Sequence, residues 1–157
     1  MGGRVPWVLL AYRMPREPST PRITVWRKLR RLGVLQVVDG LVALPADART
    51  REQLEWLADE VAEAGGEATI WLGQLGSAAQ ERALAARMAD TVAGEYRQLV
   101  AEAAEAKTQP DAARGRTLAR LRRELHRVGQ RDFFPPPERE QAQAAIAALA
   151  AMVVVAS

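Results

Sequence analysis

The residues with the clearest chemical potential are four cations grouped within residues 20–33, TPRITVWRKLRRLG. At about 100° per residue, they share one side of a helix: Arg27, Lys28, Arg30 and Arg31. Guanidinium and ammonium groups cannot be buried cheaply, so this side must face water or an anionic partner. We expect these cations to contact phosphate groups of nucleic acid, or to pair with carboxylates of this protein.

The other side of the same segment is apolar and needs a surface to pack on, which we take to be the flanking strands. Its members are Val25, Trp26, Leu29 and Leu32. Thr20 suits the N-cap, Pro21 the first helical position, and Gly33 the end of the helix. The segment is therefore predicted to be a short helix with one basic and one apolar face.

Further basic residues extend the candidate nucleic-acid surface. Arg13 precedes this helix in a neighbouring loop, and Arg22 lies in its first turns. A second group is predicted on one face of a later helix, spaced over three turns: Arg116, Arg120, Arg123 and Arg127. We call this second group the arginine stripe.

The net charge of +3 hides a strong block pattern. Residues 1–33 carry eight Lys or Arg against one Glu, and residues 39–105 carry five basic against thirteen acidic groups. Residues 107–131 return to about +6, and the remainder is about −2. The basic blocks could bind nucleic acid, or could pair with the acidic block within the chain or across a dimer.

The first 75 residues have the pattern of an α+β domain. Pro6–Arg13 predicts a strand, and a polar loop over residues 14–19 leads into the basic helix. Residues 34–38 and 41–45 are apolar runs that flank Asp39-Gly40, so they predict a hairpin with positive φ at both turn positions.

A second helix and a fourth strand complete this pattern. Thr50 and Gln53 have capping-box spacing, and Gly65-Gly66 ends the helix. Its buried stripe is Leu54, Leu57 and Val61. Residues 67–72 then form a strand, which gives the order β-α-β-β-α-β. This order predicts a ferredoxin-like antiparallel sheet with both helices on one face.

Residues 76–157 are predicted to be a helical extension packed on that domain. Ser77 and Gln80 again have capping-box spacing, and the buried positions follow at helical intervals: Leu84, Met88, Val92, Tyr96, Leu99 and Ala103. A break at residues 108–110 precedes a helix to about Val128, with an inner face of Leu118, Leu121, Leu125 and Val128. Residues 131–137 form a proline-rich corner, residues 138–152 a last helix, and residues 153–157 a frayed tail.

Motifs for catalysis or cofactor binding are missing from the sequence. It has no cysteine, P-loop, GxGxxG motif, nucleophile elbow or paired metal ligands, and its one histidine, His126, looks like a helix-surface residue. We therefore expect no enzyme activity, cofactor or metal. The apolar run at residues 5–11 is too short to cross a bilayer and too close to the start for a signal peptide, so we expect a soluble cytoplasmic protein without membrane contact.

Trp56 stands out on the second helix. It falls roughly opposite the buried leucines, among Gln53, Glu60 and Glu63, where an isolated domain would leave it in water. We expect the C-terminal helices or a partner chain to cover it, which makes Trp56 a candidate interface residue.

Three stretches carry a family resemblance: WVLLAYRMPREPSTPRITVWRKLRRLG, then LVALP, then LEWLADEVAEAGGEATIW. They resemble the N-terminal domain of the ChrB family of chromate-resistance regulators. The late segment LHRVGQRDFFPPPEREQAQAAIAAL is similar to the end of that domain. The resemblance implies a transcriptional regulator of chromate-efflux operons. The chain stops where the chromate-responsive C-terminal domain of longer members would begin, so direct chromate sensing is not implied.

A more distant similarity is to the ferredoxin-like domain of PaaX-type repressors and of small CRISPR adaptation nucleases. Those nucleases place a metal-binding aspartate at the end of the first strand, where this sequence has Tyr12-Arg13. This difference argues against nuclease activity. Two functions remain open: a DNA-binding regulatory module, or a non-enzymatic domain that forms homo-oligomers through the sheet edge and the Trp56 surface.

Overall fold

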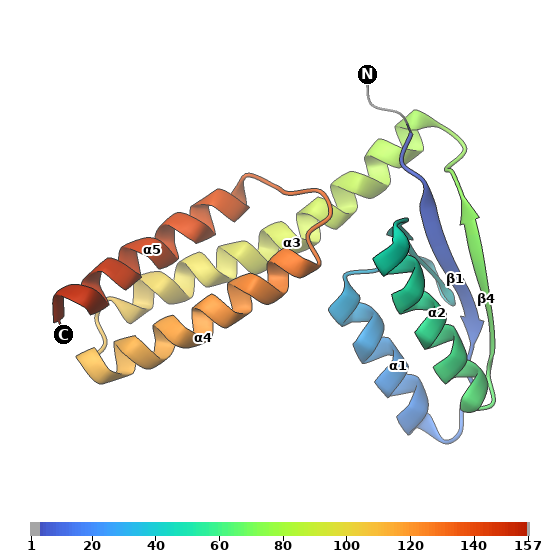
Figure 1. Ribbon diagram of the computed structural model, residues 1–157, viewed down its shortest axis with the longest axis horizontal. Coiled ribbons are helices and arrows are strands. Elements are labelled where there is room, and N and C mark those ends of the chain that lie inside the picture. Colours follow the sequence, from blue (N-terminus) through green and yellow to red (C-terminus); the bar gives the residue numbers. More distant parts are fainter. Residues whose placement is uncertain (1–3, 157) are drawn as a thin grey trace. The chain divides into compact units, whose positions relative to one another are not determined.

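The computed structural model describes the backbone of residues 4–156 and the side chains of residues 4–153. The chain divides into two compact units, one up to Ala85 and one from Ala86 onward, and each is described by itself (Figure 1). The division falls within helix α3 (Ala78–Ala106), whose first turns belong to the first unit.

The first unit contains a four-stranded antiparallel sheet in the order β2-β3-β1-β4. The strands are β1 (Trp7–Arg13), β2 (Leu35–Val38), β3 (Leu41–Pro45) and β4 (Glu67–Gly73). Helix α1 (Ser19–Leu32) follows β1 and helix α2 (Ala48–Glu63) follows β3, and both lie on one side of the sheet (Figure 1). This is the ferredoxin-like βαββαβ arrangement that the sequence predicted.

The buried core of this unit lies between the sheet and the two helices. Val8 and Leu10 of β1 are fully buried, and they pair in register with Leu44 and Val42 of β3. Leu54, Leu57 and Val61 are buried as expected, and so are Val25 and Leu29. Leu32 is only half-buried, which corrects its predicted place in the core, because it comes in the last turn beside the exposed helix end.

Helix α1 begins earlier than the predicted Thr20 cap. Its N-cap is Pro18, which offers no side-chain hydrogen bond, and the Thr20 carbonyl instead accepts a hydrogen bond from the Thr24 hydroxyl at 3.0 Å. The predicted stop is confirmed: Gly33 has φ 82°, and its N–H donates to the Arg30 carbonyl oxygen. The left-handed conformation at Gly33 carries little cost for a residue without Cβ.

The β2–β3 hairpin turns at Asp39-Gly40, but only Gly40 has positive φ (78°). The prediction that both turn positions have positive φ is therefore wrong. The pairing register shifts between Gln36 and Val38, and this bulge accommodates a turn with one left-handed residue. The Gly40 carbonyl accepts a hydrogen bond from the Tyr12 N–H at 2.8 Å, and a Cβ at Gly40 would lie 2.7 Å from the Tyr12 oxygen.

Helix α2 also starts before its predicted cap. The capping box is formed by Asp47 and Thr50, not by Thr50 and Gln53: the Thr50 N–H donates to Asp47 Oδ1 at 2.8 Å, and the Asp47 N–H donates to Thr50 Oγ1 at 2.9 Å. The Thr50 hydroxyl also donates to the Pro45 carbonyl at 2.7 Å, which ties the helix start to the end of β3. Aspartate is as good a cap as threonine, and the chain uses the earlier residue.

The second unit contains most of α3 together with α4 (Asp111–Gln130) and α5 (Glu138–Ala156). At the start of α3, the Gln80 N–H donates to the Ser77 hydroxyl at 3.2 Å, as the capping spacing predicted. Helix α5 continues through Ala156, so the predicted fraying is wrong for residues 153–156, and Ser157 lies outside the described residues. No glycine or proline interrupts this alanine-rich segment, so its backbone remains helical.

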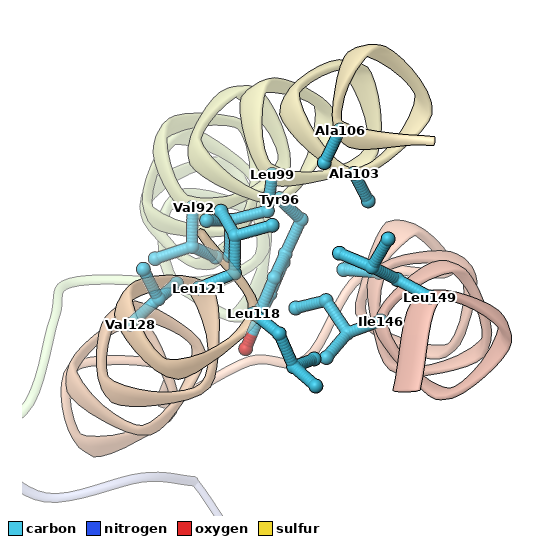
Figure 2. Packing of buried hydrophobic residues seen from close by; sticks show 11 residues of the cluster. Val92, Tyr96, Leu99, Ala103, Ala106, Leu118, Leu121, Val128, Ile146 and Leu149 are labelled. Carbon is cyan, nitrogen blue, oxygen red and sulfur yellow. The ribbon is translucent and has the colours of Figure 1, made fainter. Parts of the chain in front are cut away.

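The interior of the second unit is a cluster of small and aliphatic residues around Tyr96 (Figure 2). The predicted inner positions of α3 are buried except Leu84, and Leu118, Leu121 and Val128 are buried on α4. The Tyr96 hydroxyl donates to Asp132 Oδ2 at 2.7 Å. Burial and this hydrogen bond raise the pKa of Tyr96, so the phenol stays protonated to high pH.

Candidate nucleic-acid interface

The cations of α1 are exposed, as the helical pattern predicted. Arg27, Arg30 and Arg31 lie on the side away from the buried Val25 and Leu29. The helix contains no acidic residue, so nothing on α1 itself can neutralise these groups. The charge on its outer surface is therefore only positive, although the exposed Ile23 also lies on this helix.

Lys28 differs from the three arginines because it has a carboxylate partner. Lys28 lies on the flank that faces α2, where its Nζ is 2.7 Å from Glu60 Oε1. Among the described side chains, residues 4–153, no ion pair or hydrogen bond involves the guanidinium group of Arg27, Arg30 or Arg31. The predicted set of four cations becomes three free arginines and one paired lysine. We call Arg27, Arg30 and Arg31 the α1 arginine face.

Two further candidate arginines of the first unit also differ in whether a carboxylate pairs with them. Arg13, at the end of β1, pairs with Glu67 at 3.0 Å, and both side chains are about four-fifths exposed. Such an open ion pair is worth little and can exchange for another anion. Arg22 is exposed and, in the part of the chain that the structure describes, has no ionic partner.

The arginine stripe of α4 is exposed along its whole length, opposite the buried leucines. Two of its members have carboxylate partners: Arg120 pairs with Glu102 at 3.3 Å, and Arg127 pairs with Glu124 at 3.2 Å. Arg116 and Arg123 form no ion pair within the described residues. Internal pairing with the acidic middle block thus accounts for part of the stripe and for Lys28, but not for the α1 arginine face.

Trp56 is 65 % exposed, so the prediction that a partner covers it stays a prediction. The structure adds its surroundings, which the sequence did not place: Trp56 lines a groove between α1 and α2 together with Lys28, Arg31 and Gln53. Helical periodicity does not predict that the aromatic residue of one helix lies beside the cations of the other. Only the tertiary packing of α1 on α2 brings them together.

The resolved pKa shifts have structural causes and fall outside the basic faces. The Thr50 N–H lowers the pKa of Asp47 by its hydrogen bond at the start of α2. Burial, with the nearby charge of Asp39, raises the pKa of Tyr12. Among the described residues, no group of three or more His, Asp or Glu side chains could hold a metal ion, and no described helix is long and apolar enough to cross a membrane.

The fold and these surfaces define a ferredoxin-like α+β unit with a basic outer helix, followed by a helical unit. The family model described as Protein ChrB, N-terminal, matches residues 22–154, so the chain belongs to this family. It is also 27 % identical over 133 residues to Protein ChrB of Cupriavidus metallidurans. That match covers 82 % of this chain and 40 % of the relative. No solved structure shows significant similarity.

Proposed function

We propose that this chain is a nucleic-acid-binding regulatory module without enzyme activity. The observation that supports it most is the α1 arginine face, where the side chains of Arg27, Arg30 and Arg31 are exposed and have no ion-pair or hydrogen-bond partner among residues 4–153. Adjacent like charges repel one another, so a cluster without counter-charges lowers stability unless it binds an anion. A polyanion with regularly spaced phosphates fits Arg27 and, one turn later, the adjacent Arg30 and Arg31.

The neighbouring helix restricts how DNA can approach. On its outer side, α2 carries Glu52, Asp59 and Glu63, which are exposed and form no ion pair within the described part of the chain. Their charge repels phosphate, so the nucleic-acid backbone should run along α1 and away from α2. Lys28 is already neutralised by Glu60 and contributes less than the arginines.

The family resemblance adds the biological setting to this proposal. ChrB-like proteins are implied to regulate chromate-efflux operons, and the α1 arginine face lies within the segment that carries the resemblance best. The chain spans less than half of the curated relative that it matches, so the activity of the longer protein is part of the proposal.

A salt series tests the proposal. The wild-type chain should bind duplex DNA from upstream of its own operon, and its affinity should fall steeply between about 50 and 200 mM salt because counterions are released on binding. Arg27→Gln should flatten the plot of log affinity against log salt by about 0.9, and should weaken binding to all sequences alike.

Arg97→Gln is the matched control, since it removes one exposed cation that is not in the candidate set. Arg97 pairs with Glu138 at 2.9 Å on the surface of the second unit. This control should keep the wild-type salt slope. Absence of DNA binding by the folded wild type at about 50 mM salt would contradict the proposal.

Edge strand β4 supports a second candidate function, homo-oligomerisation. Its Trp71 is 60 % and its Leu72 is 52 % exposed, and among the described strands β4 pairs only with β1. Residues 68–73 of β4 include no charge or proline, the usual protection of an edge strand. A second copy could pair with this edge. Sedimentation should then show a dimer for the wild type and a monomer for Leu72→Lys, whereas a monomeric wild type would exclude this function.

A further inference from the structure

The groove between α1 and α2 brings together side chains of different chemistry from the two helices. It has a volume of about 350 Å³, and Trp56 forms one wall. Gln53 lies one turn before Trp56 on α2, and Lys28 and Arg31 line the opposite side, from α1. The groove thus offers an aromatic ring, an amide and a guanidinium group within one small volume.

The exposure of Trp56 is the feature that needs an explanation. Tryptophan is a costly residue to leave in water, yet 65 % of Trp56 is exposed, while Leu57 beside it is 5 % exposed. The indole is therefore not needed to fill the core of this unit. It is available as a flat surface on which another planar group can stack.

The charges around the groove identify the kind of group that would stack. Glu60 also lines the groove, but Lys28 neutralises it at 2.7 Å, whereas the Arg31 side chain has no partner within residues 4–153. The free charge inside the groove is therefore positive, and it is continuous with Arg27 and Arg30 on the same helix. A planar ring that carries a negative group is the complementary ligand, and a nucleotide has both.

We propose that this groove binds one unpaired nucleotide of a nucleic-acid strand, with its base stacked on Trp56 and its phosphate paired with Arg31. This proposal rests on the proposed nucleic-acid function and adds a specific contact to it. The Gln53 amide has both donors and an acceptor, so it can hydrogen-bond the edge of any base. The α2 carboxylates Glu52, Asp59 and Glu63 keep the strand's phosphates over α1, which directs the base toward Trp56.

The experiment compares two labelled probes of equal length and charge: an oligothymidylate, and the same backbone with abasic sites throughout. The full chain should bind oligothymidylate about 5- to 150-fold more tightly, the usual contribution of one base stacked on an aromatic side chain. Trp56→Leu should abolish this preference and leave affinity for the abasic probe unchanged. Trp56→Phe should keep most of the preference, because the phenyl ring still stacks.

Trp71→Leu is the matched control, because Trp71 is a similarly exposed tryptophan (60 %) that lies on the β4 edge and does not line the groove. Whatever its oligomeric state, it should keep the wild-type preference for oligothymidylate over the abasic probe, and circular dichroism should show both leucine variants folded. Equal binding of the two probes by the wild type would overturn the groove proposal and leave the α1 arginine face intact. Binding of neither probe, nor of duplex DNA, would overturn both proposals.

One more outcome separates nucleic acid from a protein partner. If Trp56→Leu lowers the oligomeric state in sedimentation and leaves the base preference unchanged, Trp56 is an interface residue between chains and the nucleotide assignment is wrong. If the base preference is lost without a change in sedimentation, the assignment is supported.

Discussion

Helices α1 and α4 carry the same sequence pattern, an apolar inner face and a row of cations outside, but they differ in how many of their arginines have a carboxylate partner. Half of the arginine stripe on α4 is paired, Arg120 with Glu102 and Arg127 with Glu124, whereas Arg116 and Arg123 form no ion pair among the described residues. The arginines of α1 have no such partner among the described residues. A basic stripe therefore indicates a binding surface only when its neighbours leave it uncompensated.

The first prediction concerns the inner faces, where the two helices should behave alike. Leu29 of α1 and Leu121 of α4 are each 0 % exposed. Leu29→Ala and Leu121→Ala should each lower the free energy of unfolding by about 2–5 kcal/mol, because each leaves a cavity in a packed interior. Urea unfolding measures this, and a loss below about 1 kcal/mol for only one of them would show that this helix packs loosely.

The second prediction concerns the polar contact that supports the unit containing α4. In Tyr96→Phe, the carboxylate of Asp132 loses its 2.7 Å hydrogen bond, which should cost about 1–3 kcal/mol of unfolding free energy. Since the pKa of Tyr96 is raised in the folded state, its contribution is fully present below the unfolded pKa near 10 and is lost as pH rises above it. The wild type should lose stability in this alkaline range, and Tyr96→Phe should lose less; equal alkaline slopes would contradict this account.

The third prediction compares a paired and a free arginine directly. Arg131, just after α4, lies 3.0 Å from Glu95 and 3.5 Å from Glu124, and its side chain is 15 % exposed. Arg131→Gln should cost about 1–2 kcal/mol, because two carboxylates lose a partly buried partner. Arg30→Gln should change the unfolding free energy by less than about 0.5 kcal/mol, since Arg30 has no partner to lose. Similar losses of unfolding free energy in both variants would contradict the distinction between paired and unpaired arginines.

Much of the fold could be predicted because local signals and tertiary structure agree. The alternation of strands and helices, the hairpin at Asp39-Gly40 and the Gly33 stop are all encoded in short segments. The errors lie where two local solutions compete. Asp47 replaces Thr50 as the cap of α2, and Pro18 precedes Thr20 at α1, because several residues near a helix start can serve as its boundary.

The candidate site could be predicted less well, because it depends on distances between segments far apart in the sequence. The sequence showed that Arg27 and Arg31 share a face with Lys28, but not that Glu60, 32 residues later, would neutralise only the lysine. It also placed Trp56 among carboxylates of its own helix, whereas packing brings it beside Arg31 of α1. Charge pairing across elements cannot be inferred from helical periodicity.

The most direct test of the account measures the salt dependence of DNA binding for two matched variants. A triple variant removes the α1 arginine face through Arg27→Gln, Arg30→Gln and Arg31→Gln. A double variant removes the paired members of the arginine stripe through Arg120→Gln and Arg127→Gln. The triple variant should lose about 2–3 units of the slope of log affinity against log salt, and the double variant less than about 1. Equal losses in the two variants, or an unchanged slope in the triple variant, would contradict the claim that the free arginines of α1 bind nucleic acid.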